Sequence, residues 1–268
     1  MSRILKLFEE ISYFQVTILG IIQGITEFLP VSSSAHLLLW SKLSGVSYLG
    51  KAFDVALHGG TLGALIFAKS DLLKKISQGE GSYKCLIPIV FFATIFPGIF
   101  GFLLEDVVEE YFHSVYFLAF SLAFFGLLLW YVDKYFAEDG ELQSIDRRQS
   151  LLIGLIQSLA LLPGVSRLGI LLTASRGFHL NRFLAGELAL VSSIPIVAGA
   201  FFVKLCKGFE LPSAEMWPLV IWGILFSFLT GLLGIKLLEF VLRKGSLKYV
   251  AVYRLLLALA VLVFCGNM

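Results

Sequence analysis

Residues 20–36 read Gly-Ile-Ile-Gln-Gly-Ile-Thr-Glu-Phe-Leu-Pro-Val-Ser-Ser-Ser-Ala-His, and this stretch decides the fold. It lies inside the apolar segment 12–44, which is too long for one membrane helix of about 20 residues and too short for two with a loop. Pro30 and a group of polar side chains interrupt the segment halfway. Irregular backbone at membrane depth is tolerated only inside protein or beside a water-filled cavity. We therefore expect a re-entrant hairpin of two half-helices.

A second interrupted segment covers residues 150–179, with Leu-Pro-Gly-Val-Ser-Arg at its break, residues 162–167. The two segments resemble each other, because Gly, Gln, Val and Ser of the first recur 134 positions later, at Gly154, Gln157, Val165 and Ser166. Six other segments are long and apolar enough to cross a membrane, near 52–69, 85–104, 112–132, 183–204, 217–239 and 248–266. Each hairpin is thus followed by three spans.

This order predicts an all-α polytopic membrane protein built as an inverted-topology repeat, each half a re-entrant helical hairpin plus three transmembrane helices. Residues 1–268 form a single integral membrane domain, with repeat 1 at about 12–132 and repeat 2 at about 150–266. Three crossings turn the second repeat upside down relative to the first. The hairpins then enter from opposite faces and their tips meet near the midplane, as in transporters with broken helices.

Composition agrees with this fold and excludes other classes of protein. The chain is 58% hydrophobic and only 15% charged, which excludes a soluble enzyme, a nucleic-acid binder and a disordered chain. Thirteen Lys and Arg lie in or beside the loops near 70–84, 133–149, 176–182 and 240–248, against six on the opposite face. The positive-inside rule makes the first face cytoplasmic. Both termini and the mouth of the first hairpin then face outward.

The scarce polar groups gather at the two tips, and ionisable groups inside a membrane by default mark function or a buried partner. Gln23 and Glu27 share one helix face, while Ser32 and His36 repeat that spacing beyond the proline. We expect each proline to start a half-helix whose free N–H groups bind an anion. Arg167 can hold a phosphate with two hydrogen bonds, and imidazole can move a proton near neutral pH. The tips therefore indicate phosphoryl transfer.

Three other polar residues receive structural interpretations. Arg254, in the last span, is expected to pair with a carboxylate and to support packing. Asp54 and His58 lie four positions apart at the outer end of the first full span. We expect a helix cap or a support of the tip from the first and a packing role from the second.

The run from Gln23 to His36 resembles the (E/Q)xxxE-FLPVSS-xxH signature of the bacterial undecaprenyl-diphosphate phosphatases, also called bacitracin resistance proteins. Residues 163–167 resemble the second signature of that family, PGxSRS, although Leu168 replaces its last serine. The resemblance covers nearly the whole chain, since it extends to Phe53-Asp54, Glu187 to Pro195 and Tyr253-Arg254.

The resemblance implies an enzyme of the bacterial inner membrane that hydrolyses undecaprenyl diphosphate to undecaprenyl phosphate and inorganic phosphate. This reaction recycles the lipid carrier of peptidoglycan synthesis and confers resistance to bacitracin, which competes indirectly by binding the substrate. It implies a divalent cation, Mg²⁺ or Ca²⁺, held by Glu27. The catalytic candidates are Glu27, Ser33, His36 and Arg167, and the phosphate-binding or supporting candidates are Ser32, Ser34, Ser166, Gly164 and Gln23.

Several alternatives stay open at this level. The nucleophile is either Ser33 or a water activated by His36 or Glu27. A homodimer is compatible with the sequence, and no nucleic-acid partner is indicated. Inverted repeats with broken helices also build transporters, so a flippase of undecaprenyl phosphate is the alternative function. The other membrane lipid phosphatase superfamily is disfavoured, because its Lys/Arg-Arg-Pro, Ser-Gly-His and Ser-Arg-His blocks are absent.

Overall fold

The computed structural model describes residues 12–45, 51–112, 114–206, 216–244 and 246–266, and within these ranges it contains helices and no β-strand. The first half of the chain forms α2 (Tyr13–Glu27), α3 (Ser33–Ser44), α4 (Lys51–Ala68), α5 (Ser70–Ser77), α6 (Leu86–Tyr111) and α7 (Val115–Tyr135). The second half forms α8 (Arg147–Gln157), α9 (Arg167–Gly177), α10 (Arg182–Cys206), α11 (Trp217–Arg243) and α12 (Lys248–Cys265). Short 3-10 helices lie at Gly81–Cys85, Leu142–Ser144 and Ser158–Leu161.

Five of the expected membrane spans are long apolar helices in the structure. They cover Gly81–Leu104, Val115–Tyr135, Arg182–Phe201, Trp217–Arg243 and Lys248–Cys265. The sixth, expected at 52–69, is α4, whose apolar portion Phe53–Ala68 is shorter. These helices expose large apolar side chains, among them Phe91, Phe102, Phe120, Leu229 and Leu256, as a surface facing lipid requires. The predicted all-α polytopic membrane protein is confirmed.

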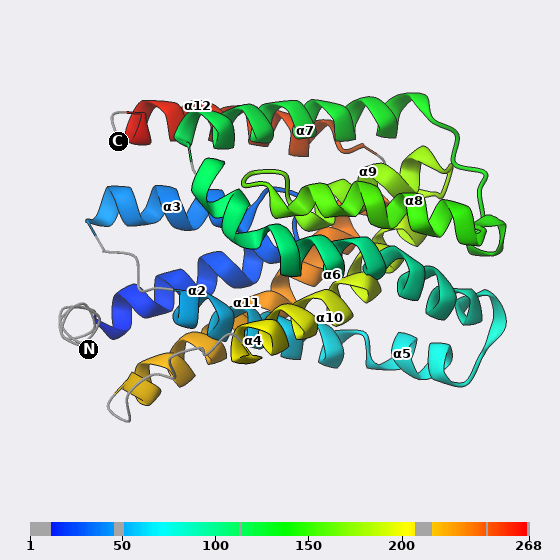
Figure 1. The fold of residues 1–268 in the computed structure, drawn as a ribbon, viewed down its shortest axis with the longest axis horizontal. Helices are drawn as coiled ribbons and strands as arrows, with labels where there is room; N and C mark the ends of the chain where they lie inside the picture. The colour runs from blue at the N-terminus through cyan, green and yellow to red at the C-terminus, as the bar shows by residue number, and fades with distance from the viewer. Residues whose placement is uncertain (1–11, 46–50, 113, 207–215, 245, 267–268) are drawn as a thin grey trace.

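Both interrupted segments form hairpins with an irregular tip. Helices α2 and α3 reach the middle of the molecule from one end, and α8 and α9 reach it from the other (Figure 1). None of the four exceeds 15 residues, which is short of a full membrane crossing. The first helix of each hairpin begins with a capping box, formed by Ser12 with Gln15 and by Asp146 with Gln149. Because the two hairpins reach the middle of the molecule from opposite ends, their tips lie next to each other in the interior.

Each hairpin packs against long helices from the other half of the chain. Helix α11 packs on α2 while α6 packs on α8, and α12 packs on α3 while α7 packs on α9. Helices α7 and α12 also pack together along one side of the molecule (Figure 1). An inverted repeat would produce this arrangement, and the repeat itself stays a prediction.

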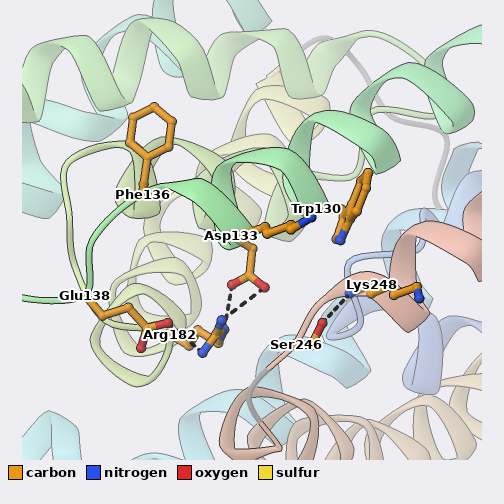
Figure 2. A pocket seen from close by; sticks show the side chains of 8 residues that line it. Trp130, Asp133, Phe136, Glu138, Arg182, Ser246 and Lys248 are labelled. Atoms are coloured by element: carbon orange, nitrogen blue, oxygen red, sulfur yellow. Dashed lines mark hydrogen bonds and ion pairs between the residues drawn. The ribbon is translucent and has the colours of Figure 1, made fainter.

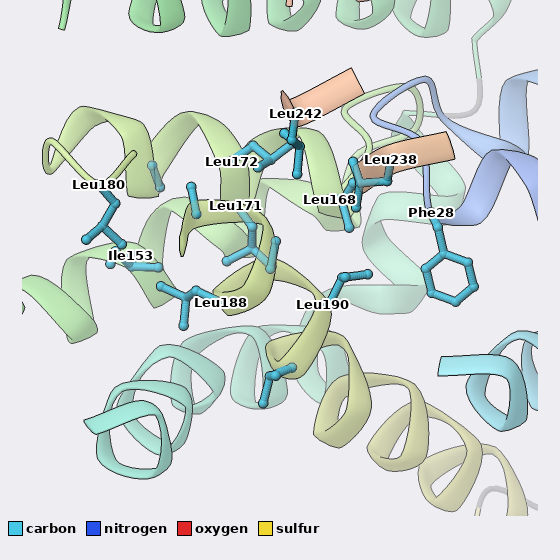
Figure 3. Close-up of a cluster of buried hydrophobic side chains, with 14 of the residues drawn as sticks. Phe28, Ile153, Leu168, Leu171, Leu172, Leu180, Leu188, Leu190, Leu238 and Leu242 are labelled. Carbon is cyan, nitrogen blue, oxygen red and sulfur yellow. The ribbon is translucent and has the colours of Figure 1, made fainter. Parts of the chain in front are cut away.

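The second hairpin is enclosed by the hydrophobic core. Every residue from Leu168 to Arg176 in α9 is buried, and its leucines contact leucines of α10 and α11 (Figure 3). Leu168, which stands where the resembling signature has serine, is one of these core side chains. Its apolar character therefore serves packing. The core fixes α9, and with it the position of Arg167 at the start of the helix.

The first hairpin is held by a close crossing of α2 and α11. Gly24 is buried there, and a Cβ atom at this position would lie 2.0 Å from Thr230 Oγ1 and 2.6 Å from the Ser227 carbonyl oxygen. Small residues let membrane helices approach to this distance. The crossing places Gln23 and Glu27, on the same helix, in the interior.

We expect Gly24→Ala to lower the thermal stability of the protein in detergent, because the added methyl group must push α11 away. Overpacking of this kind costs about 1–3 kcal/mol and sometimes more. Gly59→Ala is the matched control, since a Cβ atom in α4 at that position meets no atom within 4 Å. Thermal unfolding of both variants beside the unsubstituted protein tests the crossing. Equal unfolding temperatures for the two variants would contradict it.

Candidate active site

Each hairpin tip ends in a serine of unusual backbone conformation. Ser32 has φ 70° and precedes α3, and Ser166 has φ 68° and precedes α9. Positive φ is uncommon for a residue with a side chain. The expectation that each proline starts a half-helix is wrong, because Pro30 and Pro163 lie in the turns before these serines. The helices begin at Ser33 and Arg167, so their free N–H groups start one residue after each strained serine.

Gly164 lets the second tip pack against α7. Its φ is 87°, and a Cβ atom would lie 2.7 Å from the Leu118 carbonyl oxygen. The structure therefore gives Gly164 a role in close backbone packing. Its suggested role in binding phosphate stays a prediction.

Glu27 is the centre of the candidate site. Its Oε1 atom forms an ion pair with Arg167 Nη2, and its Oε2 atom accepts hydrogen bonds from Ser33 Oγ at 3.0 Å and Gln23 Nε2 at 2.9 Å. The Glu27 side chain is only 8% exposed. Four of the predicted site residues thus meet at one carboxylate. Because Arg167 belongs to the second hairpin, the contact joins the two tips.

His58 also lies at this carboxylate, although a packing role was expected for it. Its Nε2 atom is 3.6 Å from Glu27 Oε2, and its Nδ1 atom is 3.4 Å from Gln23 Nε2. Nδ1 also contacts the carbonyl oxygen of Asp54 at 2.8 Å, one helical turn earlier. The only sequence signal was this spacing of four residues. Nothing in the sequence shows that α4 turns His58 toward α2.

His36, one helical turn after Ser33 in α3, contacts a different pair of groups. Its Nδ1 atom is 2.7 Å from the carbonyl oxygen of Ser32, and its Nε2 atom is 2.7 Å from the hydroxyl of Tyr253. The rings of His36 and Tyr253 are parallel within 10°, with centroids 5.7 Å apart. Tyr253 was noted only as part of the resemblance, and its place beside His36 is a finding of the structure.

The remaining serines make local contacts. The hydroxyls of Ser32 and Ser34 lie 3.1 Å apart, and Ser34 is exposed. The Ser166 hydroxyl accepts a hydrogen bond from the Gly169 N–H at 3.2 Å, so it caps α9. A capping role for Ser166 agrees with the preference for serine at helix starts.

Arg254 is fully buried, and the expected carboxylate partner is wrong. Its guanidinium donates hydrogen bonds to five backbone carbonyls, those of Pro30, Gly164, Val165, Ser121 and Leu122, at 2.8–3.3 Å. These acceptors belong to the first tip, the second tip and α7. Arg254 therefore ties both tips to one helix of the scaffold.

Two pockets lie away from the tips. One, with a volume of about 430 Å³, is lined by Trp130, Asp133, Lys134, Arg182, Lys248 and three neighbours (Figure 2). Asp133 is already neutralised there by Arg182, whose Nε lies 2.6 Å from Oδ1. This pocket contains none of the predicted site residues.

The residues at the tips fit a divalent cation only together with a phosphate. Within the described ranges no three His, Cys, Asp or Glu side chains are grouped as a metal site. Mg²⁺ is often bound by one or two carboxylates plus substrate phosphates. Glu27 can supply the carboxylate. The neighbouring Gln23 Oε1 atom is buried with no hydrogen-bond partner among the described residues, and it can supply a second oxygen.

Comparison with known proteins gives one consistent result. The model of a family described as bacitracin resistance protein BacA matches residues 16–260. An undecaprenyl-diphosphatase of Caldicellulosiruptor bescii is 40% identical over 257 residues, covering 94% of this chain and 97% of that protein. Proteins of the same name from Alteromonas mediterranea and Geobacter sulfurreducens are 37% and 40% identical, covering 94% and 92% of this chain and 98% and 96% of their own lengths.

Proposed function

Since the chain belongs to the bacitracin resistance protein BacA family, we infer that it is a membrane hydrolase that converts undecaprenyl diphosphate to undecaprenyl phosphate and inorganic phosphate. The enzyme recycles the lipid carrier of cell-wall synthesis and thereby supports resistance to bacitracin. The observation that carries the assignment of the site is the ion pair between Glu27 and Arg167, which joins the two hairpin tips.

Arg167 and the starts of α3 and α9 would bind the diphosphate. The guanidinium can form two parallel hydrogen bonds with phosphate oxygens, and free N–H groups at helix starts attract anions. In the structure Arg167 is paired with Glu27. The arriving diphosphate would therefore take the guanidinium from the carboxylate, which becomes free for other partners.

Glu27, once released, would hold the divalent cation with Gln23 and the diphosphate. Both side chains lie on one face of α2 and are joined by a hydrogen bond of 2.9 Å. When bound, the cation supplies neutralisation of phosphate charge. Ser33, which now donates to Glu27, would donate to a phosphate oxygen instead.

Water is the nucleophile that the geometry favours, with His36 as the base. The partner of the Ser33 hydroxyl is Glu27, and a carboxylate in an ion pair is a weak base. His36 holds its Nδ1 atom against the Ser32 carbonyl, which leaves Nε2 to accept a proton. A positioned general base contributes typically about 10²–10⁴-fold to the rate.

The site would open to the outer leaflet of the bacterial inner membrane. The Lys- and Arg-rich loops lie at the end where α8 starts and α9 finishes, opposite the mouth of the first hairpin (Figure 1). This arrangement supports an outward-facing first hairpin by the positive-inside rule. The predicted outward termini include residues 1–11 and 267–268, which lie outside the described residues. Bacitracin would compete for the exposed lipid diphosphate.

The test of the function is release of inorganic phosphate from undecaprenyl diphosphate by the purified protein in a lipid bilayer. We expect release with Mg²⁺ or Ca²⁺, loss of release after treatment with EDTA, and recovery when the cation returns. Folded protein that releases no phosphate with either cation would contradict the function. Movement of undecaprenyl phosphate across the bilayer without any phosphate release would favour the flippase.

A further inference from the structure

The surroundings of His36 fix where its proton lies. A backbone carbonyl can only accept a hydrogen bond, so the contact of 2.7 Å from Nδ1 to the Ser32 oxygen places a proton on Nδ1. In neutral imidazole the other nitrogen then carries the lone pair. The Tyr253 hydroxyl, 2.7 Å from Nε2, is therefore the donor in that contact. His36 is therefore held as a base, and the hydroxyl of Tyr253 covers its only accepting atom, Nε2.

Tyr253 is fixed in this place by its own helix. The next residue, Arg254, binds carbonyls of both tips at Pro30, Gly164 and Val165, which holds this turn of α12 against the start of α3. The parallel stacking of the rings further restricts the phenol. Tyr253 is 45% exposed and His36 is half-buried, and the Tyr253 hydroxyl lies against Nε2. A proton that reaches Nε2 must therefore pass the hydroxyl or displace it.

We propose that the Tyr253 hydroxyl relays the proton from the attacking water to His36; this inference rests on the proposed hydrolysis. The water gives one proton to the Tyr253 oxygen while the O–H proton of Tyr253 passes to Nε2. The phenol is regenerated and His36 becomes an imidazolium. The hydroxide forms a bond to the terminal phosphorus, and the bond from that phosphorus to the bridging oxygen breaks. Undecaprenyl phosphate leaves with the electron pair of that bond, and the imidazolium later returns its proton to solvent water.

The relay explains why two partners hold the imidazole. The Ser32 carbonyl can stabilise the positive charge that develops at Nδ1–H when Nε2 is protonated. The hydroxyl supplies both a donor to Nε2 and an acceptor for water, and a phenylalanine ring supplies neither. A tyrosine that served packing alone would need only its ring. The hydroxyl is thus the group to remove.

The test compares Tyr253→Phe with His36→Gln and with the double variant in the phosphate-release assay. Because Tyr253→Phe removes the hydroxyl that transfers the proton, we expect kcat to fall about 10²-fold and KM to stay nearly unchanged. The double variant should be no slower than His36→Gln alone, because both substitutions break one proton path. Tyr249→Phe is the matched control, since Tyr249 lies one turn earlier on α12, is 80% exposed, and should keep the kcat of the unsubstituted enzyme.

Two results would overturn the relay. A kcat for Tyr253→Phe equal to or above that of the unsubstituted enzyme would show that the hydroxyl is dispensable or only covers Nε2. A double variant slower by the product of the two single losses would show that Tyr253 acts apart from His36. Failure of the proposed function is distinguishable, because the unsubstituted protein would then release no phosphate. Unchanged unfolding temperature of Tyr253→Phe confirms that folding is intact.

Discussion

Arg167→Ala should lower kcat/KM for undecaprenyl diphosphate by at least about 10³-fold, the lower end of the contribution of an arginine that stabilises a phosphoryl transition state. Arg167 is the only predicted site residue of the second hairpin with a charged side chain, and its guanidinium reaches Glu27 of the first. Arg167→Lys should recover a small part of the loss, because an ammonium keeps the charge but cannot form two parallel hydrogen bonds. Initial rates of phosphate release measure all variants.

Controls separate the chemistry of Arg167 from its role in folding. Removing Arg167 leaves the buried Glu27 carboxylate without its arginine partner, and breaking a buried pair typically costs about 3–5 kcal/mol. The double variant Arg167→Ala with Glu27→Gln removes this charge, so it should regain thermal stability without regaining activity. Arg148→Ala is the matched control, since Arg148 is exposed near the start of α8. Activity of the stable double variant close to that of the unsubstituted enzyme would contradict the site.

Arg254→Met should produce the largest loss of stability. The three tip carbonyls that now accept from the guanidinium, those of Pro30, Gly164 and Val165, would lose this donor in a buried place, whereas those of Ser121 and Leu122 keep the backbone hydrogen bonds of α7. An unsatisfied buried polar group costs about 1–3 kcal/mol, so the loss at the three tip carbonyls is comparable to the stability margin of many proteins. We expect little folded protein, measured as yield after size-exclusion chromatography and as unfolding temperature in detergent.

A second variant keeps the Arg254 prediction testable when folding fails. Arg254→Lys retains one charge and up to three donors, so it should fold better than Arg254→Met and still unfold below the unsubstituted protein. Its kcat should also fall, because the tips are held by fewer bonds. Met and Lys variants that unfold at the temperature of the unsubstituted protein would show that the five contacts contribute little.

The hairpins and the convergence of Glu27 with Arg167 could be predicted because they follow from covalent order. Pro30 and Pro163 interrupt apolar segments, and few polar groups exist elsewhere at membrane depth. Polar residues at such breaks must find each other or water. Hydropathy and residue spacing were therefore enough to predict the fold and the meeting of the two tips.

Other parts of the site depend on how helices rotate about their axes, which hydropathy does not encode. His58 reaches Glu27 because α4 packs against α2, and Tyr253 reaches His36 because α12 packs against α3. Arg254 bonds to carbonyls, which every residue carries and which leave no sequence signature. Ser33 faces Glu27 because the tip turns back through the strained backbone of Ser32. These contacts depend on how the helices pack against one another, so the sequence pattern alone did not predict them.

The central claim is that the two tips form one diphosphate site, and the most direct measurement is a structure with methylene diphosphonate, a diphosphate analogue that resists hydrolysis, and Mg²⁺. The analogue is expected between the starts of α3 and α9, with the Arg167 guanidinium turned from Glu27 to the phosphonate oxygens. An analogue bound away from both tips, for example in the pocket between Asp133 and Lys248, with the Glu27–Arg167 pair intact, would contradict it.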